Sequence, residues 1–375
     1  MSRSRIMVLG LGDVGGDVLE MLVRAPGAYH IITGDVREEW GYRKTNIAAY
    51  GAAQLGCYPE LEFTPVDLFN VEQTAATIVR YKPDIIYVAA TLQSWWVIST
   101  LPPDVFEELD EARYGPWLPM HLLLVYRLMQ AVQDTGRDVK VINSCFPDAV
   151  NPVLAKAGLE PTIGIGNVAN PIPAIRASIG HQLGVPMQEV TVYFVCQHFL
   201  SYFAPRFGHT GGAPYYLKAI VNGDDVSGRL DIDAVFGELS RRFRRVGGRD
   251  GQILTASSGA ATTLAMANDT REFMHAPGPN GLPGGYPVRV DADGGEVVLP
   301  SDITLAEAIE INEQCGRFDG IERIDDDGTV HFVDKNMKVM QDMLGYYAKS
   351  MRLDETEERY RELDRKFKEF ASQYH

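Results

Sequence analysis

The sequence predicts an α/β protein, with a doubly wound parallel sheet in the first half and a second α/β unit after it. Three observations support this prediction. An apolar strand runs into a glycine-rich turn within residues 6–16, strand and helix patterns alternate up to about residue 150, and the strands are short, apolar and bounded by turn residues. With 375 residues, the chain can bury the cores of two lobes.

The first half contains five expected strands. Pro83 marks a turn at the entry to the fourth strand, and the fifth ends in the polar pair Asn143-Ser144. Because the carboxyl ends of parallel strands lie at one edge of a sheet, the residues that end these strands should face one ligand crevice. The expected strands cover residues 6–10, 30–35, 61–67, 82–90 and 139–144, and the expected helices cover residues 13–25, 71–81 and 120–135.

The turn after the first strand reads Gly10-Leu11-Gly12-Asp13-Val14-Gly15. Gly10 permits a tight strand-to-helix turn, Gly12 lets the backbone approach a pyrophosphate, and Gly15 lets the helix pack against the strand. The free amides and the dipole at the helix N-terminus attract phosphate. We therefore expect a Rossmann-type dinucleotide-binding domain, with Gly10, Gly12, Asp13, Val14 and Gly15 at the cofactor.

An acidic residue follows this turn at the distance that such a domain requires. Asp35 ends the second strand, where a carboxylate can accept hydrogen bonds from both hydroxyls of the adenosine ribose and repel a 2′-phosphate. This favours NAD as the cofactor, while Arg37, Arg43 and Lys44 keep NADP open as the alternative. The other residues expected at the cofactor end the third and fourth strands: Asp67, Ala89, Ala90 and Thr91.

The second half begins with an expected helix at residues 172–183 and a strong strand at 189–196, which His198 follows. Further strands are expected at residues 215–222 and 286–290, a helix capped by Ser301 or Thr304 at 302–313, and helical structure from Met337 onward. The last segment carries an apolar stripe and is interpreted as a surface helix docked on the body, with a subunit contact as the alternative. We divide the chain into a NAD-binding domain (1–150), a substrate and catalytic domain (151–336) and a C-terminal helical extension (337–375).

Composition excludes several classes of partner. The net charge of −15 argues against nucleic acid and anionic membranes, and no apolar run reaches the length of a membrane span. The four cysteines show no paired spacing, which indicates reduced thiols in a cytoplasmic protein, and no motif predicts a metal site. The apolar strand starts so close to Met1 that no signal peptide is expected.

Several segments of the second half, in a fixed order, resemble a known family. They are Asn143-Ser144 with Pro147-Asp148, the segment 172–176 ending in Arg176, the strand end 195–198 with His198, the small-residue segment 258–267, and residues 284–307. In this order and spacing they are similar to the lactate/malate dehydrogenases over about residues 139–312. The chain therefore resembles a divergent member of this NAD-dependent oxidoreductase superfamily, with a lactate/malate dehydrogenase-like α/β C-terminal domain.

The resemblance implies a role for three residues and an oligomeric state. His198 is the expected acid/base, which suits an imidazole that titrates near neutral pH. Arg176 is expected to bind an anionic group of the substrate, and Asn143 to contact the reacting oxygen or the nicotinamide side. A homodimer or homotetramer that takes a small-molecule substrate is also implied.

The sequence departs from the family at the positions that support this histidine. Pro173 stands where the family has the aspartate that orients the histidine. Either another acid replaces it, for which Asp148 is a candidate, or the substrate and the chemistry differ. The stretch after the fourth strand is long and aromatic, with Arg113 as its only arginine, where the family has a mobile loop with an arginine. Phe199, rather than glycine, follows the histidine.

Aromatic residues in the insertion and after His198 indicate a broad pocket, which favours a substrate bulkier than lactate or malate. They are Trp95, Trp96, Trp117, Tyr202 and Phe203, for which ordinary packing is the alternative interpretation. The arginine-rich run 241–245 is interpreted as a solvated helix face, with anion binding as the alternative.

We expect an NAD-dependent dehydrogenase or reductase that acts on a secondary alcohol or ketone. The first half also resembles the extended short-chain reductases and sugar-nucleotide epimerases, but Gln130 replaces the lysine that would pair with Tyr126 in their mechanism. Two alternatives remain open: an epimerase or lyase that uses NAD transiently, and a non-catalytic NAD-binding sensor.

Overall fold

The computed structural model describes residues 4–27 and 29–374. Its central element is a six-stranded parallel sheet in the order β3-β2-β1-β4-β5-β6. This is the strand order of the Rossmann fold, so the predicted fold class is confirmed. The strands are β1 (Ser4–Leu9), β2 (Tyr29–Asp35), β3 (Glu60–Pro65), β4 (Ile85–Val88), β5 (Lys140–Asn143) and β6 (Ile163–Gly164).

Helices cover both faces of this sheet, and the central strand shows why. Ile6 and Val8 of β1 pack into a core with residues of the first helix, whereas Met7 and Leu9 pack into a core on the opposite face. Successive side chains of a strand point to opposite faces, so a run of apolar residues requires cover on both sides. The helices of this half are α1 (Asp13–Leu22), α2 (Glu38–Gln54), α3 (Val71–Tyr81), α4 (Pro103–Asp110), α5 (Leu118–Thr135) and α6 (Pro147–Ala155).

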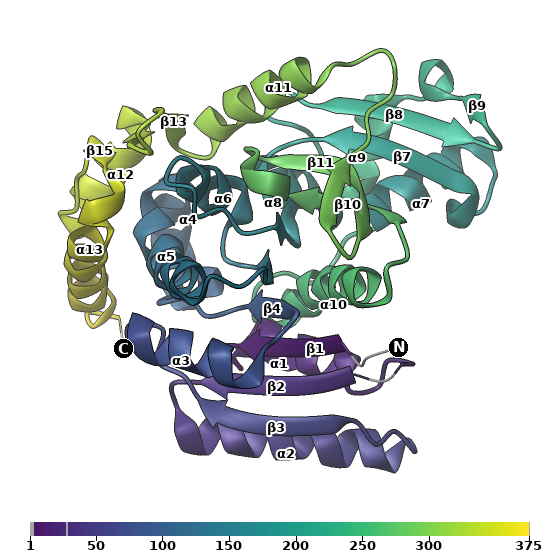
Figure 1. Ribbon diagram of the computed structural model, residues 1–375. Helices are drawn as coiled ribbons and strands as arrows, with labels where there is room; N and C mark the ends of the chain where they lie inside the picture. Colours follow the sequence, from purple (N-terminus) through teal and green to yellow (C-terminus); the bar gives the residue numbers. More distant parts are fainter. Residues whose placement is uncertain (1–3, 28, 375) are drawn as a thin grey trace.

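The second half adds two small antiparallel sheets, in the orders β7-β8-β9 and β10-β11-β12, which an isolated bridge between Cys196 and Gly285 connects. Its helix α10 packs against α1 and so joins the halves (Figure 1). The elements are α7 (Ile172–Leu183), β7 (Val190–Val195), α8 (His198–Phe207), β8 (Tyr216–Val221), β9 (Asp224–Asp225), α9 (Ile232–Leu239), α10 (Gln252–Asn268), β10 (Glu272–Pro277), β11 (Gly285–Asp291), β12 (Gly294–Val297) and α11 (Leu305–Phe318).

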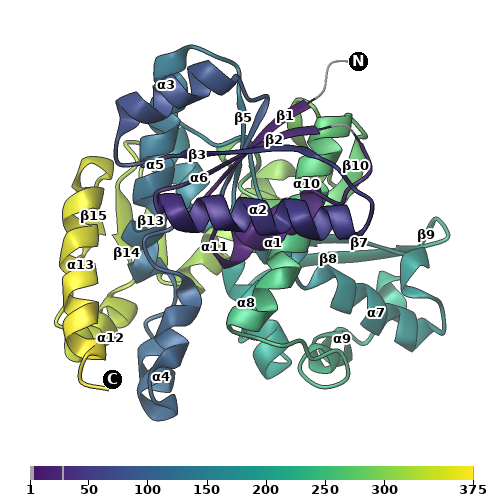
Figure 2. The same ribbon diagram turned by 90° about the horizontal axis from the view of Figure 1, so that it is seen from below.

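The C-terminal part was expected to be helical from Met337 onward, and the structure differs from that expectation. Helices α12 (Asp334–Leu344) and α13 (Thr356–Ala371) are separated by β15 (Ser350–Met351), which joins a sheet with β13 (Ile321–Ile324) and β14 (Val330–Phe332). Strand β15 forms by pairing with β14, which is distant in the sequence, so the local residue pattern could not indicate that the helical structure is interrupted there. Helix α13 lies along α5, as Figure 2 shows.

Short 3-10 turns complete the chain, and none of the helices that the structure describes is long and apolar enough to cross a membrane. The turns are η1 (Trp95–Thr100), η2 (Gly115–Trp117), η3 (Asn167–Ala169), η4 (Met187–Glu189), η5 (Ser227–Arg229), η6 (Arg249–Gly251), η7 (Pro279–Gly281) and η8 (Leu353–Glu355).

Candidate active site

A cavity of about 1330 Å³ opens at the carboxyl ends of the parallel strands. The glycine turn, the ends of β2 and β4, the segment around η1, helix α8, residues 244–255 and part of α13 all contribute to its wall. This is the crevice expected for a doubly wound sheet. Of the residues predicted at the cofactor, nine line it: Gly10, Gly12, Asp13, Val14, Asp35, Asp67, Ala89, Ala90 and Thr91.

The glycine turn has the geometry that its sequence requires. Gly10 has a φ of +87°, and a Cβ there would lie 2.7 Å from the backbone nitrogen of Ala90. Gly15 does not line the cavity but supports it, since a Cβ there would lie 1.9 Å from the carbonyl oxygen of Gly10. At Gly12, a Cβ would meet no heavy atom within 4 Å. The turn therefore opens onto free space just before α1 begins.

Asp35 is held at the end of β2 with both carboxylate oxygens in use. Oδ2 accepts a hydrogen bond from the backbone amide of Leu11 at 2.8 Å, and Oδ1 accepts from the amide and Nε of Arg37 at 2.9 and 3.1 Å. Trp40 donates its indole N–H to the carbonyl of Leu11, and Lys44 lies over its ring. The acid is thus preorganised beside the glycine turn, with two cations at the same edge of the cavity.

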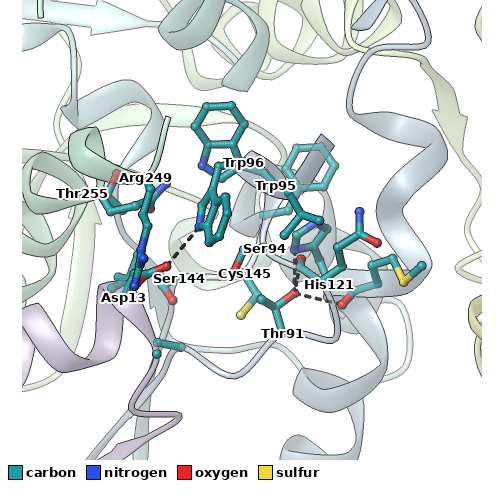
Figure 3. A pocket seen from close by; sticks show the side chains of 18 of the residues that line it. Asp13, Thr91, Ser94, Trp95, Trp96, His121, Ser144, Cys145, Arg249 and Thr255 are labelled. Atoms are coloured by element: carbon teal, nitrogen blue, oxygen red, sulfur yellow. Dashed lines mark hydrogen bonds and ion pairs between the residues drawn. The ribbon is translucent and has the colours of Figure 1, made fainter. Parts of the chain in front are cut away.

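Thr91, which also lines the cavity, forms a hydrogen bond with the buried side chain of His121. Its Oγ1 lies 3.0 Å from Nδ1 of His121 and 3.0 Å from the carbonyl oxygen of Met120 (Figure 3). Burial, with a smaller contribution from the charge of His198, lowers the pKa of His121 to about 3. His121 is therefore neutral at physiological pH.

His198 begins α8 at the end of the strand β7 and lines the cavity. Its Nδ1 lies 2.8 Å from Oδ2 of Asp319, which also accepts from Nε2 of Gln197 at 3.1 Å. Burial opposes protonation of His198, but the charge and hydrogen bond of Asp319, with the charge of Asp148, outweigh it and raise the pKa of His198. The acid that engages the histidine is thus Asp319, and not the sequence-based candidate Asp148.

An aromatic wall fixes the plane of this imidazole. The ring of Tyr114 lies between the two histidines, with its centroid 4.6 Å from that of His198 and 4.9 Å from that of His121. Phe146 packs its edge against Tyr114 at 4.5 Å. The carbonyl of Asp319 accepts a hydrogen bond from the amide of Gly115 at 2.7 Å, so one residue holds both the histidine and the segment that carries Tyr114.

Asp148 is buried close to this pair but does not line the cavity. Its Oδ2 accepts a hydrogen bond from Asn167, and its buried Oδ1 has no partner among the described residues. Burial raises its pKa to about 6, against the opposing effects of the charge of His198 and the hydrogen bond from Asn167.

The other two residues expected at the reaction centre lie outside the cavity. Arg176 sits on α7, where its Nε donates to the carbonyl of Met187 at 3.1 Å. Asn143 is fully buried at the end of β5, accepting from the amide of Cys145 at 2.8 Å and donating to Asn151 at 2.8 Å. The structure therefore brings His198 to the cavity, but not Arg176 or Asn143.

Arg245, in the arginine-rich run 241–245, lies outside any helix and lines the cavity. Its guanidinium donates to the carbonyl oxygen of Ser201, one helical turn after His198, at 2.6 Å. Among the described residues it has no carboxylate partner within ion-pair distance. Burial lowers its pKa, yet an arginine stays charged in proteins. This leaves a positive charge close to His198 and available to an anion.

Four of the five aromatic residues noted in the sequence line the cavity: Trp95, Trp96, Trp117 and Tyr202. The fifth, Phe203, stacks instead on Phe199 with 4.8 Å between ring centroids. Tyr202 donates to Asp110 at 2.7 Å and lies edge-on to Trp95 at 6.2 Å. The wall facing the histidine is therefore broad and aromatic. No group of three or more His, Cys, Asp and Glu in the described residues could hold a metal ion.

The fold and this site define an α/β protein with a Rossmann sheet and a large cavity at the carboxyl ends of its strands. Neither a protein-family model nor a curated protein matches the chain. Solved structures do: malate dehydrogenase from Salinibacter ruber aligns with a TM-score of 0.56 and 18% identity over 90% of this chain and 98% of that one. The chain therefore has the fold of the lactate and malate dehydrogenases, as the resemblance predicted.

Two lactate dehydrogenases give the same result. The enzyme from Eimeria maxima, solved with NADH and oxamate, aligns with a TM-score of 0.56 and 13% identity over 83% of this chain and 90% of its own. The enzyme from Cryptosporidium parvum, solved with lactic acid and nicotinamide adenine dinucleotide, aligns with a TM-score of 0.56 and 15% identity over 85% of this chain and 99% of its own.

Proposed function

We propose that this protein is an NAD-dependent oxidoreductase that interconverts a secondary alcohol and a ketone on a substrate bulkier than lactate or malate. The observation that carries the proposal is the His198–Asp319 pair, 2.8 Å apart, in the cavity into which the glycine turn opens. The likeness in fold to enzymes solved with NADH or nicotinamide adenine dinucleotide supports the choice of cofactor.

The residues at the glycine turn fit NAD. The open space at Gly12 and the start of α1 suit a pyrophosphate, and the Asp35 carboxylate suits the ribose hydroxyls. Asp67, Ala89, Ala90 and Thr91 would line the rest of the cofactor site. When bound, NAD supplies the hydride acceptor and, in its reduced form, the hydride donor.

His198 would move the proton that accompanies the hydride. Its Nδ1 is engaged by Asp319, so Nε2 is the nitrogen left for the substrate oxygen. Neutral His198 accepts the hydroxyl proton during oxidation, and protonated His198 returns it during reduction. Asp319 orients the ring and stabilises the imidazolium, which is the role of the aspartate in other His–Asp pairs.

Arg245 would anchor an anionic group of the substrate, because it is the cavity arginine near His198 that lacks a carboxylate partner within the described chain. Arg176 would contribute only indirectly, from α7, and Asn143 would position the backbone of Cys145 at the cavity wall. The aromatic wall and the volume of about 1330 Å³ support a substrate larger than a short hydroxy acid.

The first test is calorimetric titration of the apo protein with NAD and NADP, with Asp35→Ala as the control. We expect NAD binding that the substitution abolishes or strongly weakens. Bulky secondary alcohols with an anionic group are then screened for NADH formation. Failure of the apo protein to bind either dinucleotide would overturn the proposal. Retained cofactor with substrate conversion and no net NADH would indicate transient redox chemistry, as in an epimerase or lyase.

Matched arginine variants test the anchor. Arg245→Ala should raise KM for an anionic substrate by about tenfold to a hundredfold, since a hydrogen-bonded charge pair contributes about 1.5–3 kcal/mol. Arg176→Ala should leave KM nearly unchanged. The reverse result would indicate that Arg176, on α7, is the residue that binds the anionic group.

A cytoplasmic homodimer or homotetramer completes the proposal. The absence of disulfides among Cys57, Cys145, Cys196 and Cys315 supports a reducing compartment. Sedimentation equilibrium would test the subunit number, and a monomer at micromolar concentration would contradict it.

A further inference from the structure

We infer that Arg249 is a ligand of the cofactor's pyrophosphate, and that the Asp13 carboxylate holds this arginine beside the phosphate site until the cofactor binds. The inference rests on the proposed NAD site and assigns a new residue to it. Asp13 is the first residue of α1 and lines the cavity next to Gly12. Arg249 comes from η6, in the second half of the chain, and also lines the cavity.

The two oxygens of Asp13 are bound from two different segments. Oδ1 lies 2.9 Å from Nε of Arg249, and Oδ2 accepts the indole N–H of Trp96 at 3.0 Å. The guanidinium carbon of Arg249 also lies 5.6 Å from the centroid of the Trp96 ring. Figure 3 shows the three side chains together at one side of the cavity.

The charge of Asp13 is unusual at this position. A carboxylate at the first residue of α1 gains from the helix dipole, but it stands where a pyrophosphate would bring further negative charge. Like charges at short range repel each other, so a cation must neutralise Asp13 when a dinucleotide binds. Among the described residues, Arg249 is the cation that forms an ion pair with Asp13.

Arg249 can serve both partners. A guanidinium carries five N–H donors in a planar fork that matches phosphate oxygens, and only Nε–H is engaged with a protein acceptor in the described part of the chain. Its side chain is 66% exposed and lines the cavity. Arg249 can therefore keep or exchange its contact with Asp13 while its other N–H groups bind phosphate oxygens.

The residues around Arg249 suit this exchange. Gly247, Gly248 and Gly251 flank it, and Gly248 has a φ of +64°, which few other residues adopt without strain. All three also line the cavity, so the backbone of this segment lies at the cavity wall. Arg249 is thus presented to the glycine turn from the second half of the molecule.

Calorimetric titration of the full-length apo protein with two probes at low ionic strength tests this assignment. ADP-ribose contains the pyrophosphate, and adenosine has the same base and ribose without phosphate. We expect Arg249→Ala to weaken ADP-ribose binding by about tenfold to a hundredfold, the range of a charged hydrogen bond, and to change adenosine binding less than about twofold. Arg249→Lys should recover part of the loss because the charge remains.

Two further variants separate the assignment from general effects. Arg242→Ala removes a neighbouring arginine that does not line the cavity, and should leave both affinities unchanged. Asp13→Asn keeps an acceptor for Trp96 but removes the competing charge, so ADP-ribose should bind more tightly.

Equal ADP-ribose affinity in the wild type and Arg249→Ala would overturn the inference while leaving the cofactor proposal intact. If the wild type bound neither ADP-ribose nor NAD, the cofactor proposal itself would fail, and this inference with it.

Discussion

Nδ1 of His198 lies 2.8 Å from Oδ2 of Asp319, although 121 residues separate them in the chain. The histidine starts α8, and the aspartate is the C-cap residue that follows α11. The hydrogen bond fixes the orientation of the imidazole and leaves Nε2 free of protein partners in the described structure. A charged acceptor at Nδ1 also favours the protonated ring.

Asp319→Asn should lower kcat/KM by about 10²–10⁴-fold, the range seen for acid/base groups and their orienting aspartates. Since Asp319 raises the pKa of His198, its removal should lower that pKa. Alcohol oxidation, which needs neutral His198, should then persist to lower pH than in the wild type. Ketone reduction, which needs protonated His198, should decline at a lower pH than in the wild type as the pH is raised.

The pH dependence of kcat/KM in both directions checks this prediction. Asp326→Asn, at an exposed acid that pairs with Lys156, is the matched control and should retain the wild-type profile. An unshifted profile in Asp319→Asn would mean that the histidine is not the titrating group.

Asp148→Asn should stabilise the fold at neutral pH. Burial raises the pKa of Asp148 from 3.8 to about 6, so the folded protein holds this proton more tightly than the unfolded chain. Stability is therefore lost as pH rises from about 4 to about 6, by an amount on the order of 3 kcal/mol. Asparagine keeps an acceptor for Asn167 without the buried charge. Chemical denaturation at pH 4 and pH 7.5 should show a gain at the higher pH only.

Asp35→Asn should shift cofactor preference toward NADP. The substitution removes the charge that repels a 2′-phosphate, while Arg37 and Lys44 remain at the same edge of the cavity. We expect the ratio of NAD to NADP affinity, measured by calorimetry, to fall by at least about tenfold. As a control, Asp67→Asn should leave the ratio of NAD to NADP affinity unchanged. An unchanged ratio in Asp35→Asn would mean that the ribose does not bind at Asp35.

Gly15→Ala and Gly16→Ala should differ sharply in spite of being neighbours. A Cβ at Gly15 would lie 1.9 Å from the carbonyl oxygen of Gly10, whereas one at Gly16 would meet the flexible end of Lys44 at 3.1 Å. Thermal unfolding should show a loss above about 2 kcal/mol for the first variant. The second should be neutral or up to about 1 kcal/mol more stable, as for glycine to alanine within a helix. Equal stability of the two variants would contradict the close packing at Gly15.

The glycine turn could be predicted from the sequence because its constraints are local. Gly10 needs a positive φ and Gly15 needs the space of a hydrogen atom, so both leave a signature within a few residues. Asp35 could be found in the same way, because it ends the strand that follows.

The carboxylate that holds His198 could not be predicted, because it comes from a segment that is distant in the sequence. The position that the family uses is occupied here by Pro173, and nothing near residue 319 marks Asp319 as its replacement. Likewise the sequence does not distinguish Arg176, within α7, from Arg245, in a loop, as the arginine that reaches the cavity. The contact of Arg245 with Ser201 of α8 decides it.

The cavity wall includes Asp364, Phe367 and Lys368 of α13 as well as Gly10 of the first turn. During synthesis on the ribosome, the first turn emerges long before these residues are made. The cavity wall is therefore complete only after α13 has emerged and packed on α5. A fusion partner or a cleavage that disturbs α13 would therefore alter a cavity whose glycine motif lies at the other end of the sequence.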